Sequence, residues 1–295
     1  MSWSPRVKTL MRSLLLAGAI TIILLVVLFP VFWMVLTSFK TRLQTFENPP
    51  LFIFPPTLEA YSSVLNLAAA LGSSAVAEVT SWGGLVYPYV INSGIVGIGN
   101  VFLSLALGVP AAYALSRLNV RGKDNIAFWM LSLRFAPGIA IAIPLFLFFR
   151  ILHLFNTYQG LILAYTSFNV PFVVWIVRSF LQDMPVDLEE SAMVDGYTRF
   201  GAFTRVTLPL LKPALAVAGI FSLIFSWNEF LFALVLTSDK TATFPVYISR
   251  FYSGMAINWG AFMASAAVGI IPVLVLTLLM QRYITKGLTM GAIKG

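Results

Sequence analysis

The sequence contains no cysteine, which excludes disulfides, thiolate metal sites and cysteine nucleophiles. Its one histidine, His153, lies beside an apolar run with no second histidine to join it, so we interpret it as a loop residue. Charged residues make up only 10% of the chain, whereas soluble domains carry roughly a quarter. Because carboxylates are also scarce in the apolar segments, we find no catalytic constellation and no metal site, and we expect the chain not to be an enzyme.

Apolar residues are correspondingly abundant, at 59% of the chain. So few polar side chains cannot cover a globule, and the surplus apolar surface is therefore predicted to face membrane lipid. The formal net charge of +8 would suit a nucleic-acid partner, but membrane proteins also collect lysine and arginine in their cytoplasmic loops. We therefore expect a polytopic membrane protein in contact with lipid, with no nucleic-acid partner.

Six apolar stretches are long enough to cross a bilayer as helices, which takes about 20 residues each. They cover approximately residues 13–38, 89–115, 126–149, 159–181, 213–237 and 259–281. Basic residues precede the first stretch, as in a signal peptide, but it is too long for one and no small-residue cleavage site follows closely. The sequence thus predicts an all-α fold of six transmembrane helices, in one domain over residues 1–295, with an uncleaved first span.

The basic residues are distributed unevenly between the two sides that six alternating spans define. Thirteen lie on the side of the N-terminus and four on the other, while Arg134 and Arg150 lie in or at the edge of the third span. The thirteen are Arg6, Lys8, Arg12, Arg117, Arg121, Lys123, Arg178, Arg199, Arg205, Lys212, Arg282, Lys286 and Lys294, and the four are Lys40, Arg42, Lys240 and Arg250. Because cytoplasmic loops carry the excess of lysine and arginine, both termini are predicted to be cytoplasmic.

Proline recurs inside the predicted spans, where it removes a backbone donor and can kink a helix. The positions are Pro30, Pro110, Pro137, Pro144, Pro171 and Pro272. In lipid such breaks are tolerated where neighbouring helices or a water-filled cavity satisfy the freed groups. The prolines fit a bundle around a solute path, although membrane helices without a path also carry proline.

The predicted cytoplasmic loop at about 182–212 carries the most informative residues. Asp183 can cap a short helix whose first turn would contain Pro185, and Gly196 can take the left-handed conformation that ends it. A second short amphipathic stretch follows, with Phe200 and Phe203 at helical spacing. The loop therefore predicts two short helices on the cytoplasmic face, and a solvated connector is the alternative.

The order of residue types in this loop resembles the coupling loop of binding-protein-dependent ABC importers. The matching residues are Glu190, Ser191, Ala192, Asp195, Gly196, Phe203, Leu208, Pro209 and Pro213. Ser191 stands where the family has alanine, a change of one small residue for another that still permits close docking. The run Trp227-Asn228-Glu229-Phe230 looks like carbohydrate permeases, and the tail 287–295 is similar to that of the second permease subunit of maltose-type transporters.

The resemblance implies a type I ABC importer permease fold and a bacterial plasma-membrane location. It implies four kinds of partner contact: a second permease in a heterodimer, two ATPase subunits, an extracytoplasmic substrate-binding protein and membrane lipid. The ATPase would contact Glu190, Ser191, Ala192, Asp195, Gly196, Phe203, Lys294 and Gly295. The chain itself has no phosphate-binding loop, so we expect it to bind no cofactor, and ATP and Mg to be bound by the partner ATPase.

Two charges, Arg134 and Glu229, fall inside predicted spans, where a charge costs about 2.5–3.5 kcal/mol on insertion scales. Their predicted depths are close enough for the side chains to meet. They either pair, or line the solute path together with Asn228 and Trp227, or fasten helices without touching solute. The resemblance to carbohydrate permeases implies that the solute is a sugar, oligosaccharide or polyol, and the sequence leaves open which.

The outer segment 39–88 is either a dock for the binding protein or a plain structured loop. For the whole chain, an ion-coupled secondary transporter or channel is the first alternative, because such proteins also place charges near the midplane. That alternative leaves the signature of the cytoplasmic loop unexplained. A membrane-embedded enzyme is the second alternative, for which the sequence offers no catalytic constellation, and a purely structural assembly subunit is the third.

Overall fold

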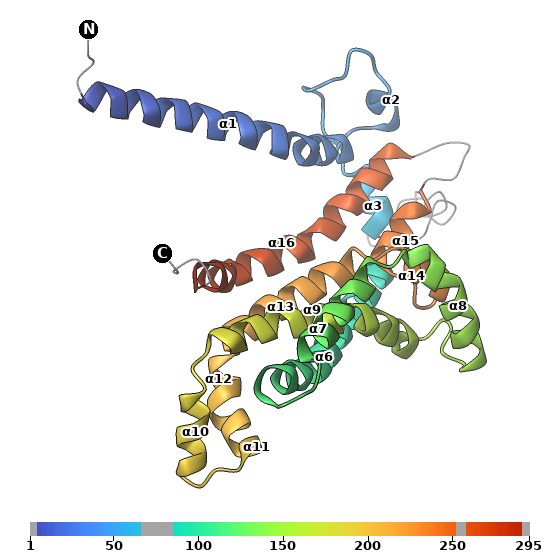
Figure 1. Cartoon of the computed structure of the whole chain (residues 1–295). Coiled ribbons are helices and arrows are strands. Elements are labelled where there is room, and N and C mark those ends of the chain that lie inside the picture. Colours follow the sequence, from blue (N-terminus) through green and yellow to red (C-terminus); the bar gives the residue numbers. More distant parts are fainter. Residues whose placement is uncertain (1–4, 66–84, 252–257, 291–295) are drawn as a thin grey trace. The chain divides into compact units, whose positions relative to one another are not determined.

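The computed structural model describes residues 5–65, 85–251 and 258–290, and all regular elements within these ranges are helices (Figure 1). The chain divides into two compact units. Unit 1 comprises Met1–Leu85 and Arg250–Val268, and unit 2 comprises Val86–Ser249 and Gly269–Gly295. The predicted all-α architecture is confirmed for the described residues.

Unit 1 contains α1 (Pro5–Ser38), α2 (Arg42–Thr45), α3 (Glu59–Leu65) and the first part of α16 (Trp259–Met290). The part of α1 from Met11 to Ser38 has a mean hydropathy of 2.9, and none of its most apolar 18 residues is buried. An apolar helix this exposed needs lipid or another chain around it. Just beyond α1, the ammonium group of Lys40 lies 4.4 Å from the Trp33 ring.

Unit 2 is built around three helices that run side by side: α6 (Tyr87–Arg117), α9 (Tyr158–Asp183) and α13 (Lys212–Trp227) (Figure 1). Small residues let the helices approach closely, as is common in membranes. At Gly108 of α6, for example, an added Cβ would lie 2.6 Å from Cγ1 of Val173 on α9. Buried apolar side chains fill the space between the helices in two clusters.

Besides the second part of α16, from Gly269 onward, the remaining elements of unit 2 are short. They are α7 (Lys123–Ser132), η1 (Leu133–Phe135), α8 (Gly138–Ile151), α10 (Asp187–Val194), α11 (Arg199–Ala202), the π-helical η2 (Phe203–Thr207), α12 (Leu208–Leu210), α14 (Leu231–Leu236) and α15 (Phe244–Ser249). His153 lies between α8 and α9 with a φ of 56°, which fits the loop position predicted for it.

Three described helices are long and apolar enough to cross a membrane, or up to five if two bent pairs each count as one span. The predicted spans 13–38, 89–115 and 159–181 correspond to α1, α6 and α9. In α16 the apolar stretch among the described residues covers Trp259–Val275. The coarse prediction of a polytopic helical membrane protein holds, and the count of six stays a prediction.

Two of the predicted span segments are not continuous helices. The segment 126–149 is broken between Phe135 and Gly138, where the axis turns by 91°. The segment 213–237 is interrupted where α13 ends at Trp227 and α14 begins at Leu231. At the first break Pro137 is the N-cap of α8. Its ring nitrogen cannot donate a backbone hydrogen bond to the preceding turn, which favours a break at this point.

Candidate functional site

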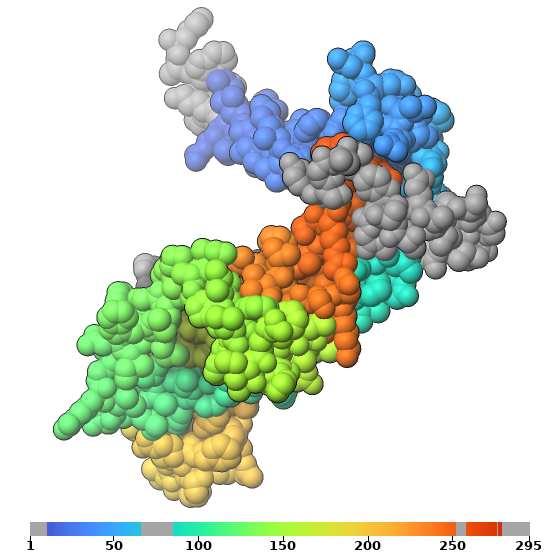
Figure 2. Space-filling view, turned by 90° about the vertical axis from the view of Figure 1, so that its right-hand side faces the viewer, coloured from blue at the N-terminus to red at the C-terminus, as the bar shows by residue number. Residues whose placement is uncertain are grey.

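The segment predicted to be a coupling loop forms short helices at one end of unit 2, and in Figure 2 it is the protruding part coloured gold. Three carboxylates in the first turn of α10 favour its positive N-terminal end: Asp187, Glu189 and Glu190. Gly196, at a φ of 92°, follows the helix in the left-handed region, as predicted. The predicted cap Asp183 is instead the last residue of α9, because the helical run of the preceding span continues to that point.

The side chains of α10 divide between an outer and an inner face. Glu190, Ser191 and Asp195 are exposed, whereas Ala192 is buried. Val194 is 86% exposed, so the outer face also presents apolar surface, to which Phe200 adds. A protein surface that mixes exposed carboxylates with large exposed apolar side chains is a candidate for contact with a partner protein.

Phe203, also predicted to contact the ATPase, is half-buried and points inward. Its ring centroid lies 4.6 Å from that of Tyr113 on α6. The predicted contacts Lys294 and Gly295 lie outside the described residues. Among the predicted coupling residues that the structure describes, the exposed ones are Glu190, Ser191, Asp195 and Gly196.

A buried ion pair that the sequence reasoning missed joins α10 to the end of α6. Arg117 Nε donates to Glu189 Oε1 at 2.9 Å, and the Tyr113 hydroxyl donates to Glu189 Oε2 at 2.9 Å. The paired side chains of Arg117 and Glu189 are only 8% and 6% exposed. Arg117 also donates to the Met184 carbonyl oxygen at 2.8 Å. No sequence signal links Glu189 to a partner so far back along the chain.

A second candidate site is a cavity of about 310 Å³ that lies where the two predicted spans are broken. The lining residues are Arg134, Ala136, Gly138, Tyr165, Phe168, Asn169, Phe225, Ser226, Glu229 and Phe232. Each break contributes one charge, Arg134 from η1 and Glu229 from the connection between α13 and α14. Interrupted apolar helices that bring polar groups to one cavity are typical of solute sites in transporters.

Arg134 and Glu229, both within the described residues, do not form an ion pair with one another, unlike Arg117–Glu189 and Arg178–Asp124. The Arg134 guanidinium lies 4.0 Å from the Phe225 ring centroid and donates to the Phe168 carbonyl oxygen at 3.2 Å. The Glu229 carboxylate accepts from the backbone N–H of Phe232 at 3.1 Å, and it thereby caps α14. Both charges therefore line one cavity with separate local partners.

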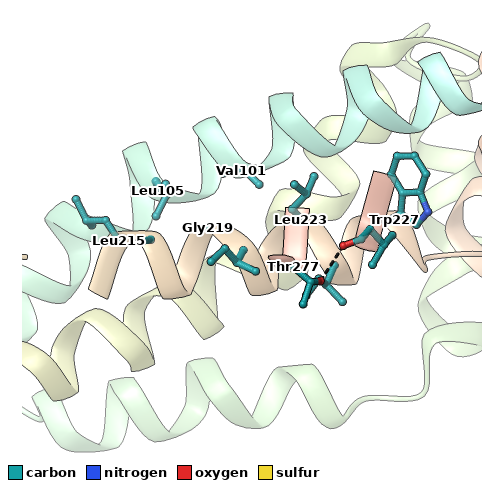
Figure 3. A pocket seen from close by; sticks show the side chains of 11 residues that line it. Val101, Leu105, Leu215, Gly219, Leu223, Trp227 and Thr277 are labelled. Atoms are coloured by element: carbon teal, nitrogen blue, oxygen red, sulfur yellow. Dashed lines mark hydrogen bonds between the residues drawn. The ribbon is translucent and has the colours of Figure 1, made fainter. Parts of the chain in front are cut away.

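Trp227 and Asn228 do not line this cavity. Trp227 is 6% exposed and lies beside an apolar groove of about 240 Å³, formed by residues of α6, α13 and α16 (Figure 3). Asn228 is exposed, and its amide donates to the Ile224 carbonyl oxygen of its own helix at 2.8 Å. Two of the four predicted path residues thus face the charged cavity, and two point elsewhere.

Comparison with known proteins identifies the family. A family model described as binding-protein-dependent transport system inner membrane component matches residues 104–290. The trehalose/maltose transport system permease protein MalG of Thermococcus litoralis is 37% identical over 293 residues, covering 98% of this chain and 99% of that protein. A probable ABC transporter permease protein, y4oR of Sinorhizobium fredii, is 36% identical over 294 residues and 100% of both chains.

The fold also matches a solved structure. A chain of a bacterial ABC transporter involved in the import of the acidic polysaccharide alginate aligns with a TM-score of 0.74 at 23% identity, covering 96% of this chain and 99% of that chain. At this identity the match shows the fold alone. The helical arrangement described above is therefore one that ABC transporter chains adopt.

Proposed function

We propose a role in sugar uptake for this chain, which belongs to the family of binding-protein-dependent transport system inner membrane components. It is a multi-pass protein of the bacterial inner membrane and a permease subunit of an ABC importer, and ATP hydrolysis belongs to partner subunits. The observation that carries this function is the match over nearly the whole chain to a sugar-transport permease. The solute we propose is a sugar, an oligosaccharide or a polyol.

Six spans with both termini in the cytoplasm are the topology that we propose. The excess of lysine and arginine on one side supports it. The absence of cysteine makes it testable with single cysteines: Arg121→Cys is expected to react with a membrane-impermeant thiol reagent only from the cytoplasmic side, and Arg42→Cys only from outside. Labelling of both positions from one side contradicts the topology.

The complex that we propose contains a second permease in a heterodimer, two ATPase subunits that bind ATP and Mg, and an extracytoplasmic substrate-binding protein. The exposed apolar length of α1 supports contact with lipid and with the second permease. The outer face of α10, with Glu190 and Ser191 exposed, supports docking into one ATPase subunit. Closure of the ATPase dimer would then push α10 and switch the pore.

Solute, in this proposal, passes the cavity between the two helix breaks. Arg134 has N–H groups beyond the one bonded to Phe168, and Asn169 adds an amide, so the wall offers donors and acceptors to sugar hydroxyls. An Arg134→Met complex is expected to keep its ATPase subunits but to transport more slowly. A sugar-bound structure with neither Arg134 nor Glu229 near the solute contradicts this role.

The experiment that tests the function is co-purification from gentle detergent. A second permease and an ATPase, in proportions of about one to one to two, are expected with the tagged chain. Glu190→Lys is expected to abolish solute transport and weaken ATPase binding, whereas Glu47→Lys, the same change at another exposed glutamate, should leave ATPase binding intact. A chain that purifies alone in several detergents, or normal transport by Glu190→Lys, refutes the assignment.

A further inference from the structure

Helix α10 packs against α11 and η2, but the side-chain hydrogen bonds that join it to other elements of unit 2 concentrate on one residue. Among the described side chains of α10, only Glu189 makes hydrogen bonds outside the helix, and both of its partners, Arg117 and Tyr113, lie in the last turns of α6. The Ser191 hydroxyl, by contrast, bonds to the Asp187 carbonyl oxygen within α10. The polar attachment of the exposed helix to the bundle is therefore a single buried cluster.

We propose that the Glu189–Arg117 ion pair is the positioning contact that transmits movement of α10 to helix α6. The inference rests on the proposed docking of α10 into the ATPase. Pulling the pair apart would leave two buried charges without partners, and an unpaired buried charge is strongly unfavourable. Because the Tyr113 hydroxyl also bonds to the second Glu189 oxygen, displacing α10 moves the end of α6 with it. Arg117 is bonded in addition to the Met184 carbonyl oxygen at the C-cap of α9.

Helix α6 continues from this cluster to the solute cavity. Asn100, about 25 Å from Arg117 at 1.5 Å per residue, donates to the Ser226 hydroxyl at 2.7 Å, and Ser226 lines the cavity. The helix between Asn100 and Arg117 is continuous even though it contains Pro110. One rigid element thus connects the exposed docking helix with the wall of the cavity.

A second ion pair at the same end of unit 2 provides a matched control. Arg178 of α9 pairs with Asp124 of α7, and this pair involves neither α10 nor α6. The Asp124 side chain is 79% exposed and the Arg178 side chain 14%, so this pair is partly solvated, whereas the Glu189–Arg117 pair is buried. If the proposal holds, losing the charge of Asp124 should leave the coupling of ATP hydrolysis to transport unchanged.

The test measures solute transported per ATP hydrolysed in purified complexes reconstituted into liposomes. Glu189→Gln is expected to retain bound ATPase subunits and ATP hydrolysis, while this ratio falls about tenfold. Asp124→Asn is expected to keep the wild-type ratio. A normal ratio in Glu189→Gln complexes overturns the proposal, and so does loss of ATPase binding with an unchanged ratio in the complexes that remain.

A second variant covers the case in which Glu189→Gln fails to assemble. In the cysteine-free chain, Glu189→Cys with Arg117→Cys can be joined by a bifunctional thiol reagent, which replaces the ion pair by a covalent link. The ratio is expected to be low before linking and to recover after it. No recovery, or failure of this variant to assemble as well, overturns the proposal. Intact ATPase binding in the Glu190→Lys complex refutes the docking of α10 itself. This result therefore distinguishes a failure of the proposed docking from a failure of the proposed ion-pair role.

Discussion

Asn100 is the residue whose loss should most weaken the packing of α6 against α9 and α13. It is fully buried, and its amide donates to the Ser226 hydroxyl at 2.7 Å and to the Ser222 carbonyl at 3.4 Å. Its carbonyl oxygen accepts from Thr166 of α9 at 3.3 Å and from Ser104 of α6 itself at 3.0 Å. Three of these four hydrogen bonds join different helices.

The expected loss of stability on replacing Asn100 follows from these three interhelical hydrogen bonds. An interhelical hydrogen bond in a membrane protein contributes about 0.6 kcal/mol on average, so three contribute about 2 kcal/mol. Asn100→Ala removes all three and leaves the buried hydroxyls of Ser226 and Thr166 with fewer partners. The equilibrium constant for unfolding should therefore rise by more than about tenfold, since about 1.4 kcal/mol corresponds to a factor of ten.

The assay is equilibrium unfolding of the purified complex in mixed micelles with increasing SDS, followed by tryptophan fluorescence. Asn228→Ala is the control, because Asn228 is exposed and its side chain bonds only within its own helix. We expect Asn100→Ala to unfold at a lower SDS fraction and Asn228→Ala to unfold close to the wild type. Equal midpoints for the two variants would refute the view that Asn100 holds the three helices together.

Three further predictions concern local structure. In Gly160→Ala the new Cβ would overlap the Leu154 carbonyl oxygen, so we expect a loss of about 1–3 kcal/mol in the same assay, whereas Gly94→Ala, with open space, should be neutral or stabilising. Thr157→Ala removes the side chain that accepts from the third residue of α9 and should cost about 1 kcal/mol; no change would show that the cap is dispensable. Burial lowers the pKa of Lys40, so the unfolded chain holds that proton to higher pH and stability should rise with pH between the lowered pKa and the ordinary lysine value. NMR titration of methylated lysines, with Lys40→Gln to assign the signal, should show the lowered pKa, and an ordinary or raised value would contradict it.

The sequence identified the positions of apolar helices but not their breaks. Six prolines marked the predicted spans, yet Pro110 and Pro171 lie inside continuous helices while Pro137 lies at a bend of 91°. A proline removes one hydrogen bond wherever it stands, and neighbouring helices decide whether the helix continues past it. The break before α14 contains no proline, and there the Glu229 carboxylate satisfies backbone N–H groups of the next helix.

For the candidate site, the depth of a residue along its span could be predicted from the sequence, but the direction in which its side chain points could not. Counting residues placed Arg134 and Glu229 at similar depth, and both line one cavity. The same reasoning grouped Trp227 and Asn228 with Glu229 because the three are consecutive. Once α13 ends at Trp227, helical periodicity no longer applies, and the three side chains point to a groove, to the surface and to the cavity.

The two adjacent glutamates of α10 face different surroundings, and the proposed coupling uses both of them. Successive residues on an α-helix are about 100° apart, so Glu190 can face outward while Glu189 faces the bundle. In the proposed docking the outward carboxylate would meet the ATPase subunit, while the inward carboxylate is held by Arg117. Because both are fixed to a single turn of helix, force applied to the first reaches the second without any further moving part. A helix with only the outer glutamate could dock but would have no buried charge by which to move α6.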